Sequence, residues 1–313
     1  MLTNGTAMLA AGAAVLVALG GGRVAPAADA NWVAGDNGHQ RYDAVQGGTD
    51  TDKNPLFFCR AYQSDDYQPG RLNPALGTCN FASGGKENTS TAYEVLVPHW
   101  ALASDGRVPV GSIQAGTDID GAPLYFCRGR HQGGIRPGKL KAGAGCSIDY
   151  GGEEILLKDY QVMQDDLPIR TDPKHGGYPI IGGIDPNRNP LPLCVANYGA
   201  SVQPGSVASD GRCHFSFGGS EVVSSNYSDV IPNLTHSAAN AVLDFVVGND
   251  TKRPAVYVCT TAYFGSLQLG KYRSDFGDLC HVGYGGAEVT GTAALLDGLS
   301  RGSFGAVNPK PNS

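Results

Sequence analysis

The sequence predicts an all-β protein, built from tandem antiparallel β repeats that pair into two compact, β-sandwich-like modules stapled by disulfides. Three observations lead to this prediction. The 313 residues include 45 glycines and 19 prolines, a composition that favours strands joined by many turns over long helices. Eight cysteines recur at regular spacing, and each one ends or begins a short apolar run. A chain of this length has room for about two domains.

Residues 1–30 differ from the rest of the chain. The apolar run "AMLAAGAAVLVALGGG" has the length of a signal peptide, and Ala28-Asp29-Ala30 offers a cleavage site before Asn31. The opening "MLTNGTA" lacks the Lys or Arg that signal peptides usually carry. A membrane anchor is the competing interpretation, but the run is short and glycine-rich for a span. We therefore expect a cleaved signal over 1–30 and a secreted, extracellular protein without a membrane span after cleavage.

The charge balance argues against one class of partner. The net charge is −6 at pH 7, and removal of residues 1–30 leaves it unchanged, since they hold one Arg and one Asp. A modestly acidic protein is poorly suited to phosphate backbones. We expect no nucleic-acid partner. An oligomer is compatible with these features.

The cysteines fall into four couples. They are Cys59 with Cys79, Cys127 with Cys146, Cys194 with Cys213, and Cys259 with Cys280. First members lie 68, 67 and 65 residues apart and second members 67 apart, so the chain holds four copies of one unit. The first members close the runs "LFFC", "LYFC", "LPLC" and "VYVC", and the second open "CNF", "CSIDY", "CHFSF" and "CHVGY". Two strands joined by a Gly/Pro turn lie within bridging distance, which predicts a disulfide within each couple.

Each such disulfide would close a loop of about 20 residues and contribute roughly 3 kcal/mol. Eight buried free thiols are the alternative, although an exported chain favours disulfides. A zinc site needs clustered ligands, but the chain has no CxxC and its seven histidines show no metal spacing. We expect neither a metal nor a cofactor.

Similarity between copies suggests how they pair. Trp32 and Trp100 each stand 27 residues before their first cysteine, where the later copies have Leu167 and Pro232. The first two copies therefore resemble each other more than the last two. This predicts two tandem pairs, over 31–165 and 166–300, followed by a disordered tail over 301–313.

Three polar positions recur in the copies. Nine residues before the first cysteine come Asp50, Asp118, Asp185 and Asp250. Twelve after it, in "QPGR", "RPGK", "QPGS" and "QLGK", come Arg71, Lys139, Ser206 and Lys271. Eight after the second cysteine, each after Gly-Gly and one further residue, come Glu87, Glu154, Glu221 and Glu288. A core needs none of these residue types, because unpaired charges are costly to bury.

Acidic and cationic side chains on neighbouring turns suit a ligand rich in hydroxyl groups. A carboxylate accepts hydrogen bonds from vicinal hydroxyls and a cation donates to an oxygen, and such charge-assisted bonds are strong. Each position also has a structural alternative. The aspartates can cap their own turns, the glutamates can form salt bridges or caps, and the bases can be solvated turn residues. We therefore rank the aspartates and bases first, and the glutamates as secondary candidates.

The string "AVQGGTDTDKNPLFFCRAY", with the later "YQPGRL" and "CNFASGGKE", resembles the DM-nine repeat family. The second copy matches as well, and the third and fourth match more weakly. The resemblance implies an all-β fold of paired repeats and, by analogy with lectins of that family, mannose binding. It further implies that the Gly-Gly-x-Asp aspartate and the Pro-Gly-Lys lysine contact the sugar.

Carried over, these contacts become Asp50 with Arg71, Asp118 with Lys139, and Asp250 with Lys271. Asp185 stands opposite Ser206, which leaves the third copy without its cation. Arginine in the first copy is not equivalent to lysine at a point contact. The disulfides are not a general feature of the family, so they suggest an adaptation to export.

Other functions fit less well. "GGIRPGK" and "GSLQLGK" lack the Ser/Thr and the helix of a phosphate-binding loop. A glycoside hydrolase could use Asp118 and Glu154 as its carboxylate pair, but fourfold repetition suits recognition better than catalysis. Calcium could bind "TDTD" and "TDID", whereas the other two copies lack the second acid. A structural exported protein without a ligand is the last alternative. The sequence thus predicts a multivalent, non-catalytic, mannose-type glycan-binding protein.

Overall fold

The computed structural model describes residues 31–36, 41–63, 66–173, 176–235, 246–248 and 255–296. The predicted signal peptide, the predicted tail and Asp250 lie outside these residues. The described part forms 28 strands, seven in each repeat, with one short 3-10 helix, η3 (Ser274–Phe276). The predicted all-β fold is confirmed.

The strands follow the same order in every repeat. In the first repeat they are β1 (Trp32–Asp36), β2 (Gln46–Thr49), β3 (Pro55–Gln63), β4 (Asp66–Asn73), β5 (Thr78–Ser83), β6 (Lys86–Ser90) and β7 (Ala92–Leu96). In the second they are β8 (Trp100–Ser104), β9 (Gln114–Thr117), β10 (Pro123–His131), β11 (Gly134–Lys141), β12 (Gly145–Tyr150), β13 (Glu153–Leu157) and β14 (Asp159–Met163). In the third they are β15 (Ile169–Asp172), β16 (Ile181–Ile184), β17 (Pro190–Tyr198), β18 (Ser201–Val207), β19 (Cys213–Phe217), β20 (Ser220–Ser224) and β21 (Tyr227–Pro232). In the fourth they are β22 (Leu234–Thr235), β23 (Val246–Gly248), β24 (Val256–Tyr263), β25 (Ser266–Tyr272), β26 (Leu279–Tyr284), β27 (Ala287–Thr292) and β28 (Ala294–Leu296).

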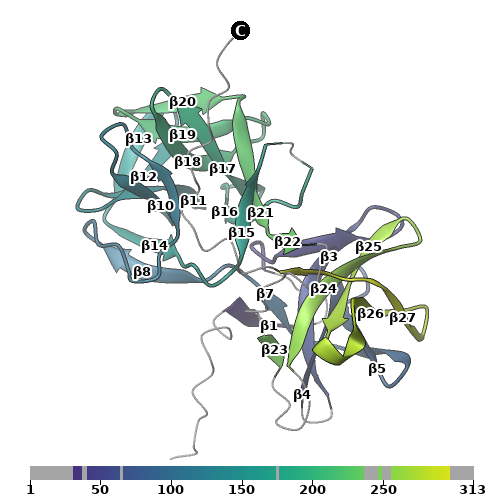
Figure 1. Ribbon diagram of the computed structural model, residues 1–313. Coiled ribbons are helices and arrows are strands. Elements are labelled where there is room, and N and C mark those ends of the chain that lie inside the picture. The colour runs from purple at the N-terminus through teal and green to yellow at the C-terminus, as the bar shows by residue number, and fades with distance from the viewer. Residues whose placement is uncertain are drawn as a thin grey trace, which may run out of the picture.

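The strands form two antiparallel, barrel-like sheets of 14 strands each. One sheet joins β1–β7 to β22–β28, and the other holds β8–β21. Figure 1 shows this directly, since the purple first repeat and the yellow end of the fourth lie in one lobe. We call the lobes the 1–4 module and the 2–3 module.

The predicted pairing of neighbouring repeats over 31–165 and 166–300 is therefore wrong. Each repeat closes on itself, because its first strand pairs with its last: β1 with β7, β8 with β14, β15 with β21 and β22 with β28. The chain then passes directly into the next repeat, which is free to join another partner. Trp32, Trp100 and their counterpart Leu167 all lie in the core that the modules share, so their likeness does not report which repeats pair.

Glycines set the contact between partner repeats. A side-chain carbon at Gly48 would collide with the carbonyl group of Leu267, and one at Gly183 would collide with that of Ile135. Both glycines belong to the recurring Gly-Gly-x-Asp motif and lie in the short strands β2 and β16. The motif thus needs glycine because backbone from the partner repeat approaches closely there.

All four predicted disulfides are present, with Cα–Cα distances of 6.0, 5.9, 6.0 and 5.8 Å along the chain. Each one lies in a small hydrophobic core of its own repeat. A fifth, larger core takes buried side chains from all four repeats, among them Phe58, Phe126, Leu193 and Val258. This core joins the two modules.

A buried ion pair also crosses between the modules. Arg128 in β10 donates to Asp43 of the first repeat at 3.0 Å, and also to the carbonyl oxygen of Gly182. Its guanidinium carbon lies 4.2 Å from the centre of the Trp100 ring. In the first repeat, Arg60 and Trp32 form the equivalent cation–π contact at 4.8 Å.

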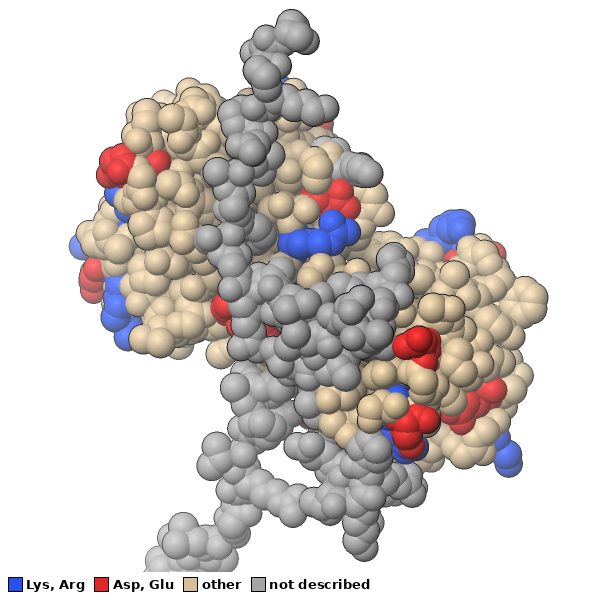
Figure 2. Space-filling view, in the orientation of Figure 1, with Lys and Arg blue, Asp and Glu red and all other residues tan. Residues whose placement is uncertain are grey.

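On the face shown in Figure 2, the described Lys and Arg side chains lie in small groups interspersed with Asp and Glu. In the described part of the chain, no helix has the length and apolar character needed to span a bilayer.

Candidate functional site

The recurring aspartates shape their own turns. Asp50 accepts hydrogen bonds from the backbone of Asp52 and Asn54 at 3.0 and 2.8 Å, and from the Asn54 side chain at 2.9 Å. Asp185 is held in the same way by Asn189. The hydrogen bond from each asparagine side chain lowers the pKa of the aspartate it holds. These carboxylates stabilise the loop before the first cysteine strand.

Asp50 and Asp118 do contact the strand that carries the predicted base, but the residue that they contact lies two positions after that base. Asn73 donates to Asp50 at 3.2 Å, and Lys141 donates to Asp118 at 2.8 Å. The predicted partners Arg71 and Lys139 stand two positions earlier. Side chains two residues apart on a strand share a face, so Lys139 and Lys141 lie on the same side. Burial alone would raise the pKa of Asp118. The hydrogen bond from Lys141 and, to a smaller extent, the charge of Lys139 lower that pKa instead.

The recurring glutamates tie partner repeats together. Glu288 accepts a hydrogen bond from the Gly85 N–H at 2.7 Å, and Glu87 accepts one from the Gly286 N–H at 2.8 Å. In the other module, Glu154 and Glu221 accept from Gly219 and Gly152, both at 2.7 Å. The Gly-Gly turns have positive φ at both positions, a conformation that glycine adopts without strain. The Gly-Gly-x-Glu motif is therefore a reciprocal cap across each module.

The bases reach across the same interface. Arg71 donates to the Gly283 carbonyl and pairs with Glu87 at 2.8 Å. Lys139 donates to Gln203 at 2.7 Å. Lys271 donates to Gln68 at 3.3 Å, and its Nζ lies 3.9 Å from Glu288. All three bases are buried, and so is Ser206, which takes the place of the base in the third repeat. Burial lowers the pKa of Lys139.

An aromatic ring from the partner repeat covers two of these bases. Tyr284 lies 5.5 Å from the Arg71 guanidinium carbon, and Phe217 lies 5.1 Å from the Lys139 Nζ. Both rings stand four residues after the second cysteine of their repeat. The corresponding residue of the first repeat is Ser83, and that repeat is the partner of Lys271. Because serine is small, a cavity of about 220 Å³ opens there, lined by Lys271, Ser83, Gln68 and Glu288 among others.

One wall of this cavity is aromatic. Phe276 from η3 lines it and stacks on His281, with ring centres 3.9 Å apart. Arg273, also at the cavity, lies 4.4 Å from the centre of the Phe276 ring and pairs with Asp275 at 2.6 Å. The cavity thus combines a cation, a carboxylate and a ring.

The surroundings of Glu288 favour the ionised form of its carboxylate. Burial alone would raise the pKa of Glu288, but the hydrogen bond with His281 and the charge of Lys271 outweigh burial and lower it. The backbone N–H of Gly85 also donates to Glu288. Charged donors and acceptors in one partly buried space can hold hydroxyl groups firmly.

Ser83, Gln68 and Phe276 were not predicted as site residues. The signal for Ser83 was present, since three copies carry an aromatic residue four positions after the second cysteine and one does not. The recurring "QPG" likewise marks Gln68. Phe276 belongs to an insertion between Lys271 and Cys280 that breaks the repeat pattern, so its role needed the structure.

Comparison with known proteins supports the resemblance drawn from the motifs. The DM9 repeat model matches residues 50–157, from the Asp50 turn to the end of β13. The matched residues run from the first repeat into the second. No curated protein matches the chain. Among solved structures, it is similar to the nematode sperm cell motility protein MFP2B at 13% identity and a TM-score of 0.18, covering 85% of this chain and 95% of that one.

Proposed function

We propose that this protein binds carbohydrate without catalysis, and that one sugar residue occupies the cavity between the first and fourth repeats. One observation carries the proposal: Lys271 and Glu288 lie 3.9 Å apart in a cavity that the partner repeat leaves open at Ser83. The DM9 match agrees with it, because the resemblance implies lectins. Four disulfides agree with a secreted protein.

The cavity offers what a pyranose needs. The Lys271 ammonium can donate to a hydroxyl or ring oxygen, and Glu288 can accept from a hydroxyl. The Phe276 ring also lines the cavity, and because His281 and Arg273 lie over its faces, its edge is the apolar surface that remains for a sugar. At about 220 Å³, the space is smaller than the roughly 300–1,000 Å³ of pockets for drug-sized ligands. It therefore suits a terminal monosaccharide, with mannose as the first to test.

We further propose one principal site per chain, where the sequence predicted three pairs of an aspartate with a base and a third copy, with Asp185 and Ser206, that lacks the base. The Arg71 and Lys139 positions are covered by Tyr284 and Phe217, and the third repeat carries Ser206 in place of a base. A millimolar site provides about −4 kcal/mol. Avidity would then require several chains on one glycan surface, which can raise apparent affinity about 10²–10⁴-fold.

The hydrolase alternative finds little support in the predicted carboxylate pair. A general acid needs a raised pKa, whereas the hydrogen bond from Lys141 overcomes burial and lowers the pKa of Asp118. Glu154 is engaged by the Gly219 N–H. Both carboxylates thus have structural partners, which favours binding over catalysis.

A glycan array probed with the full exported chain tests the proposal. We expect binding to a restricted set of glycans, loss of that binding in Lys271→Met, and retention in Lys139→Met, whose base is covered by Phe217. A reducing-sugar assay on each bound glycan should show no release. Array binding that persists in a folded Lys271→Met protein would refute the site, and released sugar would refute non-catalytic binding.

A further inference from the structure

The third repeat, which has Ser206 in place of a base, contributes to a cluster of histidine and carboxylate side chains. Ser206 faces His214 directly in the β18–β19 ladder. The imidazole Nδ1 of His214 contacts Glu221 Oε1 at 2.5 Å, as His281 contacts Glu288 at 2.8 Å in the fourth repeat. The third repeat differs because Ser206 stands where the fourth repeat has Lys271.

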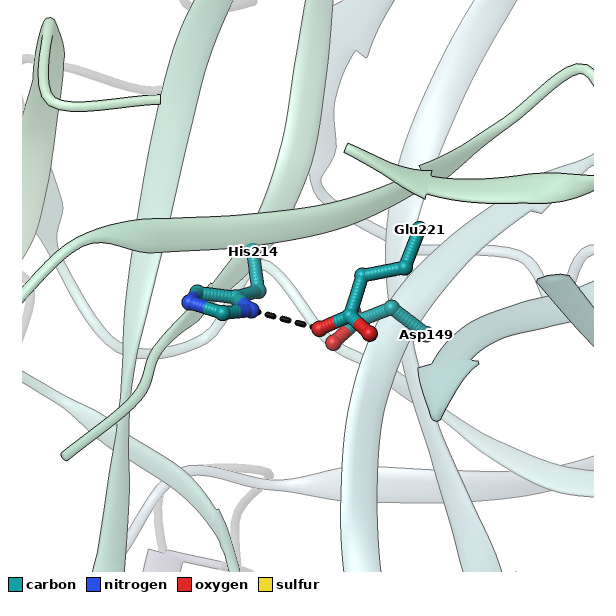
Figure 3. Close-up of side chains that lie close together, drawn as sticks. All are labelled: Asp149, His214 and Glu221. Atoms are coloured by element: carbon teal, nitrogen blue, oxygen red, sulfur yellow. Dashed lines mark hydrogen bonds and ion pairs between the residues drawn. The ribbon is translucent and has the colours of Figure 1, made fainter. Parts of the chain in front are cut away.

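The partner repeat adds a second carboxylate to this cluster. Asp149 in β12 is only 6% exposed, and its Oδ1 has no hydrogen-bond partner among the described residues. Figure 3 shows Asp149 and Glu221 side by side, with His214 directed at the glutamate. One ligand atom from each of the three residues lies within 4.8 Å of those of the other two. A buried carboxylate oxygen without a hydrogen-bond partner costs free energy, which indicates that a bound group supplies the missing partner.

We propose that Asp149, His214 and Glu221 bind a divalent transition-metal ion of the zinc class. One imidazole nitrogen and two carboxylates form a donor set that zinc accepts, and three protein ligands leave a position open for water or another ligand. The site lies between the second and third repeats, so the metal would join them. This inference does not depend on carbohydrate binding.

The surroundings of the cluster fit a metal site. His214 Nε2 lies 3.0 Å from Asp210, so Nδ1 can coordinate while Nε2–H donates to a carboxylate. Such a carboxylate–histidine pair is the usual outer shell of a metal-bound histidine. The second oxygen of Glu221 accepts from the Gly152 N–H at 2.7 Å, which fixes the direction of the first.

The charges of the cluster leave room for a cation. The buried carboxylate of Asp149 and the carboxylate of Glu221 place oxygen atoms within 4.8 Å of each other. Arg212 pairs with the outer Asp210 at 2.7 Å. The carboxylates therefore repel each other in a dry environment, and a divalent ion would relieve this repulsion.

The equivalent position in the other module differs in two ways. There, Lys271 lies beside the glutamate and supplies the cation. Ala82 of the partner repeat occupies the position of Asp149, and alanine offers no ligand atom. A third ligand is therefore missing beside Glu288, so the proposed metal site belongs to the 2–3 module.

Zinc calorimetry on the chelator-treated, full exported chain tests the proposal, and cobalt absorption reports the donor set. We expect one site per chain, with affinity reduced about tenfold or more in Asp149→Asn and in His214→Gln. Ser206→Lys should block the site by restoring the base. His99→Gln, which removes a simple His–Asp166 pair of 2.6 Å, serves as the control and should bind zinc normally. Near-ultraviolet circular dichroism establishes that each variant is folded. Absence of stoichiometric binding by the wild type, or equal affinity in the folded Asp149→Asn and His214→Gln variants, would overturn it.

Discussion

Arg128 and Asp43 form an ion pair that links the two modules, with Nη1 3.0 Å from Oδ2 and only 4% and 0% of their side chains exposed. Removing one member of a buried pair leaves an uncompensated charge, which costs about 3–5 kcal/mol. Asp43 keeps its contact with Arg41 at 2.9 Å, so Arg128→Met should lose about 3 kcal/mol, measured by urea unfolding. Arg60→Met should lose less, because its partner Glu94 is 27% exposed. An equal loss of unfolding free energy in the two variants would show that the Arg128–Asp43 pair contributes no more than the Arg60–Glu94 pair.

Ser83→Tyr should abolish glycan binding without removing any charge. The tyrosine would resemble Tyr284 and Phe217, the rings that cover the bases of the first and second repeats. It would fill the cavity beside Lys271, while stability should change by less than about 1 kcal/mol. Array binding and thermal unfolding measured together check this. Ser83→Ala serves as the control and should bind like the wild type, and binding retained by Ser83→Tyr would show that the sugar lies elsewhere.

Phe217→Ser makes the converse change in the 2–3 module. Removal of the ring 5.1 Å from the Lys139 Nζ should open a second cavity, in which Lys139 and Gln203 replace Lys271 and Gln68. Calorimetry with a binding monosaccharide should show the stoichiometry rise from one to two per chain. The free energy of unfolding should fall by about 1–2 kcal/mol, because Phe217 is only partly buried against the core of its repeat. A folded variant with unchanged stoichiometry would argue against equivalent geometry in the two modules.

Glu288 should stabilise the fold in a pH-dependent manner. Its folded-state pKa is lowered, because His281 and Lys271 outweigh the opposing effect of burial. This contribution is complete above the ordinary glutamate pKa and disappears as pH falls through the lowered value. Glu288→Gln should therefore be less stable by about 1 kcal/mol at pH 7, with the difference closing under strongly acidic conditions. Urea midpoints across pH 2–7 would measure it, and a constant difference would contradict the assignment.

Much of the fold follows from sequence spacing. The cysteine couples predicted both the fourfold repeat and all four disulfides, because two strands joined by a short turn must lie within bridging distance. The pairing of the repeats could not be predicted in the same way. It depends on which repeat supplies the backbone facing Gly48 or Gly183, and no spacing within one repeat encodes that choice. Trp32 contacts Arg60, and Trp100 contacts Arg128 in the same way. This repeated pair belongs to the core that the modules share, and it does not indicate which repeats pair with each other.

The candidate site was only partly predictable. Lys271 and Glu288 followed from repetition, but repetition selects what all copies share, and their shared role is to hold partner repeats together. The residue that leaves the cavity open, Ser83, departs from the common pattern, and so does Asp149, which completes the proposed metal site. Differences between copies, rather than their common pattern, distinguish the two modules.

Crystals soaked with the best-binding monosaccharide test the central claim most directly. The account predicts difference density for one sugar in the cavity between Lys271 and Glu288, with the ring beside Phe276 and next to the Gly84–Gly85 turn. Density confined to the aspartate turns, such as Asp118 with Lys141, and none beside Lys271, would contradict it.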